Sequence, residues 1–310
     1  MTRILATTTL ALLLAACGSD GGGDSGPAKL SLSVTDAPVD SAEAVVVSFT
    51  GVELFPSGGG DVVGFEFDPP LSIDLLALQG DNSAFLIEDA DIEAGVYDEV
   101  RLIIDTENAS CNNLVAPFAS YIRIDGTDYP LTVPSGGASG LKISGPITAA
   151  AGGRADYTID FDLRRSIAER GATGCYNLRP VLRVVDNAEV GSLFGTVDPA
   201  LLADSTCTAD PVTGRGAAVY VFEGSGIEPD DIDGTDPEPL TSALLAPVEG
   251  GGLAYEVGFL LAGDYTVALS CQAGEDEAAT DDEIAFAVTV DVAVEADAAT
   301  EQNFTVTPAP

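Results

Sequence analysis

Short runs of alternating apolar and polar residues, separated by glycine and proline, constrain the fold of this chain most strongly. The stretch 29–34 reads KLSLSV, and Tyr157, Ile159 and Phe161 alternate with polar residues in the same way. A period of two places the apolar side chains on one face of a β-strand. Further strand-like runs lie at 45–54, 71–76, 96–104, 121–124, 128–133, 178–185, 192–197, 217–222, 253–260, 264–271, 284–292 and 303–306. With 34 Gly and 18 Pro supplying turns, this pattern predicts an all-β fold, and only 166–170 suggests a helical turn.

The distribution of charge predicts two domains. Nine of the 11 basic residues after Arg3 lie between Arg101 and Arg183, whereas residues 190–310 hold one, Arg215, against 23 acidic residues. We therefore expect two domains, at 29–188 and 189–310, and the short alternating strands predict that both are β-sandwiches of the immunoglobulin type. The acidic, proline-rich stretch 223–239 is expected to be a surface loop.

The N-terminus is typical of an exported lipoprotein. Residues 1–16 carry one arginine and a short apolar run, as signal peptides do. The run ends in Leu14-Ala15-Ala16-Cys17, which resembles the bacterial lipobox and implies cleavage before Cys17 and acylation of that residue. Gly18 follows in place of the aspartate that favours retention in the inner membrane, so the resemblance implies the outer membrane. Residues 17–28 then form a flexible glycine-rich tether.

Four further cysteines are expected to form disulfides, because the chain is predicted to be exported and their number is even. They are Cys111, Cys175, Cys207 and Cys271. Three connectivities are possible, and the two-domain division favours Cys111–Cys175 and Cys207–Cys271.

Composition excludes several functions. The formal net charge of −38 opposes binding to nucleic acid, which requires basic side chains. The chain contains no histidine, so it lacks a Ser-His-Asp triad and a histidine-ligated zinc. No constellation of residues amounts to a catalytic site, and we do not expect an enzyme.

Residues 29–186 resemble the bacterial domain-of-unknown-function family 4382, found in predicted lipoproteins. The matching stretches are SLSVTDAPVDSAEAVVVSFTGVEL (31–54), IDLLAL (73–78), AGVYDEVRLIID (94–105), VPSGGASGLKISG (133–145), DFDLRRSI (160–167) and LRPVLRVVD (178–186). The resemblance implies a β-rich exported domain with no established activity.

The second unit is similar to the transthyretin-like sandwiches that accompany carboxypeptidases. The similarity rests on three stretches, GSLFGTV (191–197), LLAGDYTVALS (260–270) and QNFTV (302–306), with Leu261 in place of the usual proline. Such domains are generally accessory or binding modules.

Closely spaced carboxylates make one candidate cation site. Asp230, Asp231, Asp233 and Asp236 surround a glycine, and Ca²⁺ prefers such oxygen ligands. The distal glutamate of an EF-hand is missing, so a solvated acidic loop is the alternative.

Six basic residues form a candidate anion site, for instance for an acidic glycan, with internal ion pairs as the alternative. They are Arg101, Lys142, Arg164, Arg165, Arg179 and Arg183.

Two further groups of carboxylates have weaker interpretations. Asp160 and Asp162 lie two apart on one strand, where paired carboxylates could act as acid and base. Asp36 precedes a proline and is expected to cap a turn, or to join Asp40 and Glu43 around a cation.

These observations predict a non-enzymatic lipoprotein anchored in the outer membrane of the cell envelope, which binds or scaffolds, with Ca²⁺ as its candidate cofactor. The alternative is an accessory or hydrolytic factor for carbohydrate or polymer processing that uses paired carboxylates. The expected partners are the membrane, through the lipid anchor, and a protein or glycan ligand.

Overall fold

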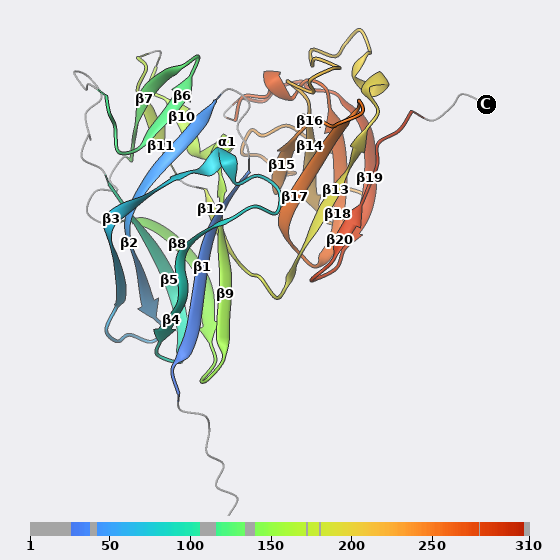
Figure 1. The fold of residues 1–310 in the computed structure, drawn as a ribbon. Coiled ribbons are helices and arrows are strands. Elements are labelled where there is room, and N and C mark those ends of the chain that lie inside the picture. The colour runs from blue at the N-terminus through green and yellow to red at the C-terminus, as the bar shows by residue number, and fades with distance from the viewer. Residues whose placement is uncertain are drawn as a thin grey trace, which may run out of the picture.

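The computed structural model describes residues 26–37, 42–105, 116–133, 140–171, 173–179, 181–278 and 280–306. Most of these residues form β-strands, which are arranged as two pairs of sheets lying side by side (Figure 1). The prediction of an all-β fold with two sandwich domains is therefore confirmed. Within the described residues, no helix has the length and apolar character needed to cross a membrane.

The smaller sheet of the first domain has four strands, and its two central strands run parallel. The order is β12 (Leu182–Asp186), β9 (Arg154–Asp162), β1 (Ala28–Ala37) and β4 (Ala84–Ile92). Alternate side chains of β1 and β9 point into the domain, so that Leu30 and Ile159 are fully buried. The predicted alternation in these two stretches thus corresponds to one buried sheet face.

The larger sheet of the first domain is built around the long strand β2 (Ala44–Pro56). The order is β10 (Ile167–Glu169), β11 (Tyr176–Leu178), β7 (Thr127–Thr132), β6 (Tyr121–Ile124), β2, β5 (Gly95–Ile104) and β8 (Leu141–Ala149), and β3 (Val63–Asp74) also pairs with β2. The short helix η1 (Leu75–Ala77) follows β3. Phe49 of this sheet meets Phe161 of the smaller sheet edge to face, with ring centroids 6.3 Å apart. The core of the domain lies between the two sheets.

The stretch 178–185 does not form the single strand that its sequence predicts. β11 ends at Leu178 in the larger sheet, and β12 begins at Leu182 in the smaller one. Buried Ser166 occupies the crossing, where its carbonyl accepts from Arg179 N–H and its hydroxyl oxygen accepts from Val181 N–H. The predicted helical turn at 166–170 is also displaced, because α1 spans Leu163–Ser166 and β10 follows at once. Both errors arise from a crossing between sheets that has no local signal.

The second domain pairs two four-stranded sheets. One has the order β16 (Ala246–Pro247), β17 (Leu253–Leu261), β13 (Val190–Val197) and β20 (Ala299–Glu301). The other has the order β15 (Thr241–Leu244), β14 (Ala218–Glu223), β18 (Gly263–Ser270) and β19 (Phe286–Val294). The short helices η2 (Pro199–Leu202) and η3 (Ala273–Glu275) lie in its connections. The predicted disulfide between Cys207 and Cys271 is present.

Strand β14 is buried on both of its faces. Val219 and Val221 belong to the core between the two sheets, whereas Tyr220 and Phe222 belong to a second, smaller core on the outer face. Ile232, from the connection between β14 and β15, packs into that smaller core. This connection was expected to be a surface loop, but part of it is buried because it covers an apolar sheet face.

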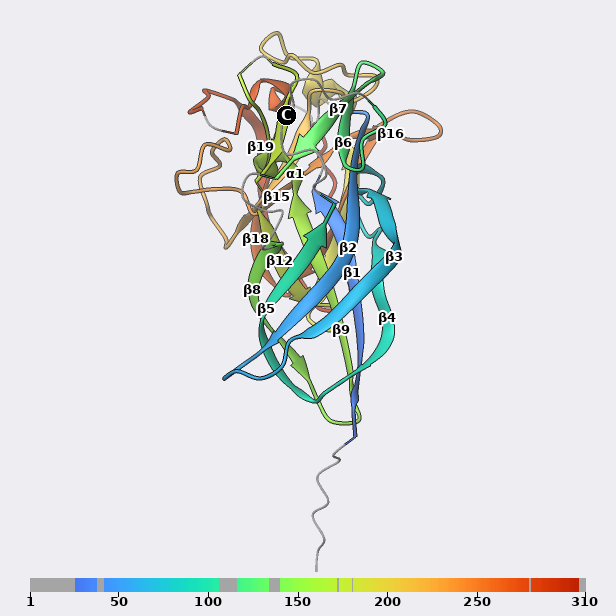
Figure 2. The same ribbon diagram turned by 90° about the vertical axis from the view of Figure 1, so that its left-hand side faces the viewer.

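The two domains contact each other closely. A side-chain carbon on Gly258 of β17 would lie 2.3 Å from the carbonyl oxygen of Gly80 in the first domain, so only glycine fits at this position. Figure 2 views the first domain with the second behind it, and β1 and β9 run along its length. In both views α1 lies at the C-terminal end of β1 and β9 (Figures 1 and 2).

Candidate metal centre and interdomain groove

Asp231 is a buried carboxylate in the connection between β14 and β15. Only 1% of the residue is exposed. Its Oδ2 accepts a hydrogen bond from the backbone N–H of Asp282 at 2.5 Å, but among the described residues Oδ1 has no hydrogen-bond partner. A buried, unpaired carboxylate oxygen is costly, because the water that would solvate it has been removed. This oxygen is therefore free to receive a ligand.

Carboxylates from distant parts of the chain gather around Asp231. Its ligand oxygens and those of Asp276 and Asp282 all lie within 4.8 Å of one another, and a second group joins Asp231 with Asp233 and Asp281. Asp276 is 8% exposed and lies just after η3, and Asp282 precedes β19. We call these five residues the acidic centre.

Burial perturbs the protonation of the acidic centre. Loss of solvent raises the pKa of the Asp231 carboxyl, and the neighbouring charges of Asp230 and Asp233 raise it further. The pKa of Asp276 is also raised, mainly by burial, although hydrogen bonding to Tyr220 and the charge of Arg164 oppose the shift. Both groups are therefore held in an environment that disfavours bare negative charge.

The sequence identified only part of this centre. Of the four predicted ligands, Asp231 and Asp233 belong to it, whereas Asp230 and Asp236 are exposed and lie in neither group. The acidic run 275–283 supplies the other members, and its composition was the only signal that could have pointed to them. Their partnership with Asp231 depends on two connections meeting over the outer face of β14.

The donor set suits a hard divalent cation. All its side-chain ligands are carboxylate oxygens, which Ca²⁺ and Mg²⁺ prefer over softer metals. Ca²⁺ accepts six to eight oxygens in flexible geometry, which a cluster of carboxylates suits. Asp231 and Asp276 would be the first ligands, since both are buried and Oδ1 of Asp231 is unpaired.

Arg164 of the first domain reaches the acidic centre. Its Nη1 donates to the hydroxyl of Tyr220 at 2.9 Å, and that hydroxyl donates to Oδ2 of Asp276 at 2.6 Å. The same Nη1 lies 3.8 Å from Oδ2 of Asp276, and Nη2 donates to the carbonyl of Ala273. This buried network links α1 to η3.

Most of the six predicted anion-binding residues are engaged in ion pairs. Arg101 pairs with Glu99 and stacks on Phe55, with the guanidinium carbon 3.9 Å from the ring centroid. Arg165 pairs with Asp162 at 2.5 Å and lies 3.5 Å from Glu238 of the second domain. The other two residues are exposed. Lys142 lies on β8, and Arg179 lies just after β11. The arrangement favours internal ion pairing over a shared anion site.

The paired carboxylates of β9 are also engaged. Asp160 is buried and its Oδ2 lies 2.6 Å from Nη2 of Arg183. The side chain of Asp162 caps α1 by accepting from the N–H of Arg165 at 3.0 Å. Neither carboxylate is placed to act on a substrate as acid or base.

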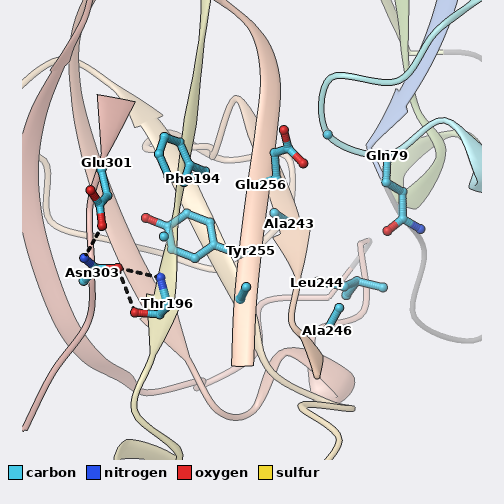
Figure 3. A pocket seen from close by; sticks show the side chains of 13 residues that line it. Gln79, Phe194, Thr196, Ala243, Leu244, Ala246, Tyr255, Glu256, Glu301 and Asn303 are labelled. Atoms are coloured by element: carbon cyan, nitrogen blue, oxygen red, sulfur yellow. Dashed lines mark hydrogen bonds between the residues drawn. The ribbon is translucent and has the colours of Figure 1, made fainter. Parts of the chain in front are cut away.

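A groove of about 430 Å³ opens between the two domains. Its floor is the outer face of β13 and β17, which carries Phe194, 38% exposed, whereas the ring of Tyr255 packs into the core on the other face. Figure 3 shows Asn303 donating to Glu301 and accepting from Thr196 beside these rings, with Gln79 of the first domain on the opposite side. The groove therefore combines an aromatic surface with fixed polar groups, and we call it the interdomain groove.

Several predicted residues lie outside the described residues. These include Cys17 with the signal peptide, Asp40, and Cys111. Cys175 is disulfide-bonded. Its pairing with Cys111 stays a prediction, because Cys111 lies outside the described residues. Glu43, which was expected to join Asp36 and Asp40, instead accepts from the N–H of Gly126 through both carboxylate oxygens.

Comparison with known protein families gives a match to the first domain. Residues 27–180 match the family described as Domain of unknown function (DUF4382). The resemblance inferred from the sequence is thereby confirmed for this domain, and the description names no activity. No curated protein matches the chain. The transthyretin-like character of the second domain stays a prediction.

Solved structures show only distant likeness. The TIE protein of Bacillus anthracis is 11% identical with a TM-score of 0.20, and the match covers 89% of this chain but only 34% of that protein. A minor pilin of Streptococcus agalactiae is 10% identical with a TM-score of 0.18, covering 90% and 98% of the two chains. The fimbrial anchor protein of Porphyromonas gingivalis is 8% identical with a TM-score of 0.17, covering 80% of each. Scores this low do not support a transfer of function.

Proposed function

We propose that this protein is a non-enzymatic binding or scaffolding module of the bacterial cell envelope, held by lipid on Cys17 and stabilised by Ca²⁺ at the acidic centre. The observation that carries the cation assignment is the buried Oδ1 of Asp231, which lacks a hydrogen-bond partner among the described residues. The absence of histidine from the sequence and the ion pair that engages Asp160 support a role without catalysis.

The cation assignment is tested by melting the chain from Gly18 onward in CaCl₂ and in EDTA at matched ionic strength. A ligand that binds only the folded state adds about 2.7 kcal/mol at 100 times its Kd. We expect a rise of roughly 5–11 °C, using about 2–4 °C for each kcal/mol. The variant Asp231→Asn should lose this rise.

Asp236→Asn is the matched control, because Asp236 belongs to the same connection but lies outside both carboxylate groups. It should keep the full response to CaCl₂. A wild-type melting temperature that is equal in CaCl₂ and EDTA would overturn the cation assignment, and an equal loss in both variants would indicate bulk electrostatics.

The anchor is tested separately in a bacterial host. We expect the full chain to incorporate labelled palmitate and to sediment with outer membranes, because residues 14–17 resemble a lipobox. Cys17→Ser should abolish the label and shift the protein to the soluble fraction. Incorporation of label into Cys17→Ser would contradict the assignment.

We assign the binding role to the interdomain groove and expect a glycan there. An exposed aromatic ring beside carboxylate and amide groups suits a ligand rich in hydroxyls, since the ring packs on its apolar face and the polar groups orient it. A glycan array with the chain from Gly18 onward should give hits that Phe194→Ala removes. Phe85→Ala is the control, because Phe85 is an exposed phenylalanine on β4 of the first domain. Hits that Phe194→Ala leaves unchanged would place the binding surface elsewhere.

A further inference from the structure

We infer that cation binding at the acidic centre and docking of the two domains stabilise each other, through α1 of the first domain. This inference rests on the proposed cation site and adds to it a regulation of the interdomain contact. The acidic centre lies within the second domain, but the basic side chains that adjoin it come from the first.

Two connections of the second domain form the surface on which α1 docks. Arg164 donates to the carbonyl of Ala273 in η3, and Arg165 lies 3.5 Å from Glu238 in the connection between β14 and β15. Oε1 of Glu238 in turn accepts from the N–H of Asp233 at 3.0 Å. Both docking points therefore belong to the connections that carry the carboxylates.

The same two connections are joined at the acidic centre. Asp231 comes from the connection between β14 and β15, whereas Asp276 and Asp282 come from the connection between β18 and β19. Their ligand oxygens lie within 4.8 Å of one another. Asp231 and Asp276 are buried and Asp282 is partly buried, so removal of a bound cation would leave the repulsion among their charges unopposed. A divalent cation binding to all three removes that repulsion and holds the docking surface in one arrangement.

The charges of Asp231, Asp276 and Asp282 are offset only when both Arg164 and the cation are present. Three carboxylates carry three negative charges, Arg164 supplies one positive charge, and a divalent cation supplies the other two. Uncompensated charge is expensive in a buried site, where the effective dielectric constant is lower than that of water. Arg164, through Tyr220, also holds Asp276 in position for the cation.

The direction in which Arg164→Gln changes the affinity for Ca²⁺ tests this inference. We would titrate CaCl₂ into the chain from Gly18 onward by calorimetry and compare wild type with Arg164→Gln. Coupling through docking predicts that Arg164→Gln weakens Ca²⁺ binding at least fivefold. Simple repulsion between Arg164 and the cation predicts tighter binding in the variant. Lys29→Gln is the control for loss of one positive charge, because Lys29 lies at the opposite end of β1 from α1 (Figure 1).

A second variant tests the same coupling in case Arg164→Gln does not fold. Tyr220→Phe keeps the buried ring but removes the hydroxyl that joins Arg164 to Asp276, and it should weaken binding in the same direction. Equal or tighter binding in both variants would overturn the coupling and leave the cation site standing. Failure of the wild type to bind CaCl₂ would overturn the cation site and the coupling together.

Small-angle scattering provides an independent readout of docking. The radius of gyration of the wild type should be larger in EDTA than in CaCl₂, since the docking surface loosens when the cation is removed. An unchanged radius, in a protein that calorimetry shows to bind Ca²⁺, would contradict the coupling alone.

Discussion

The backbone N–H of Asp282 donates to Oδ2 of Asp231 over 2.5 Å, although the residues are 51 positions apart in the chain. This hydrogen bond joins the connection between β14 and β15 to the connection between β18 and β19. It satisfies one carboxylate oxygen of Asp231 and leaves the other for a ligand. The acidic centre is thus organised by its backbone as well as by its charges.

The response to Ca²⁺ should depend on pH. Burial raises the pKa of Asp231 and Asp276, so lowering the pH protonates them in the folded state before ordinary carboxyls are affected. Protons then compete with the cation, while in EDTA the same protonation relieves repulsion and stabilises the fold. The difference in melting temperature between CaCl₂ and EDTA should therefore shrink as the pH falls from 7.5 to 4.5. A constant difference over this range would show that these two carboxyls do not bind the cation.

Asp36→Asn should stabilise the protein at neutral pH. Asp36 is 5% exposed, and among the described residues neither carboxylate oxygen has a hydrogen-bond partner of good geometry. Burial, reinforced by the charge of Asp160, raises its pKa well above the usual range. A raised acid pKa lowers stability as the pH rises above the unfolded value of about 3.9, so the gain should be largest at pH 7–8 and vanish near pH 4.

The measurement for Asp36→Asn is the melting temperature across this pH range, with exposed Asp98→Asn as the control. The Asp36 carboxyl lines a space of about 20 Å³ between the domains, which is large enough for roughly one water molecule. A loss of stability at pH 8 would mean that the buried charge has a stabilising partner. The predicted turn-capping role of Asp36 stays a prediction, because residues 38–41 lie outside the described residues.

Removal of the Cys207–Cys271 disulfide should destabilise the second domain substantially. The two cysteines are 64 residues apart, and closing a loop of that length removes unfolded-state entropy equivalent to roughly 4 kcal/mol. Urea unfolding of the double variant Cys207→Ala and Cys271→Ala measures the loss. A loss below about 1 kcal/mol would mean that the unfolded chain is already restricted without the bond.

Gly195→Ala should destabilise the edge of the sheet that forms the groove. A side-chain carbon at this position would lie 1.8 Å from the carbonyl oxygen of Gln302, where the chain after β20 crosses β13. We expect a loss of about 1–3 kcal/mol, as overpacked sites typically show, together with loss of ligand binding in the groove. Gly263→Ala is the matched control, because the atoms nearest to its side-chain carbon would be 3.9 Å away. Equal stability of the two variants would contradict the close contact.

The sequence by itself determined the secondary structure of many segments. β6 forms at Tyr121–Ile124, as predicted, and β9 contains the alternating Tyr157, Ile159 and Phe161. Strands β4 and β8 are not predicted by their sequence pattern, for local reasons. Phe85 of β4 is exposed, which disturbs the alternation, and β8 contains Gly145 and Pro146 in its interior. Alternation is a property of neighbouring residues, so it can be recognised without knowledge of the rest of the chain.

Only the tertiary structure decided which polar groups act together. Asp160 pairs with Arg183 because β12 returns beside β9, and Asp231 meets Asp276 because two connections cover the outer face of β14. The sequence indicated an acidic loop at 230–236 but could not distinguish buried Asp231 from exposed Asp236. Burial and proximity depend on the order in which distant strands pair. That order is set by packing of the whole core, and a local pattern does not record it.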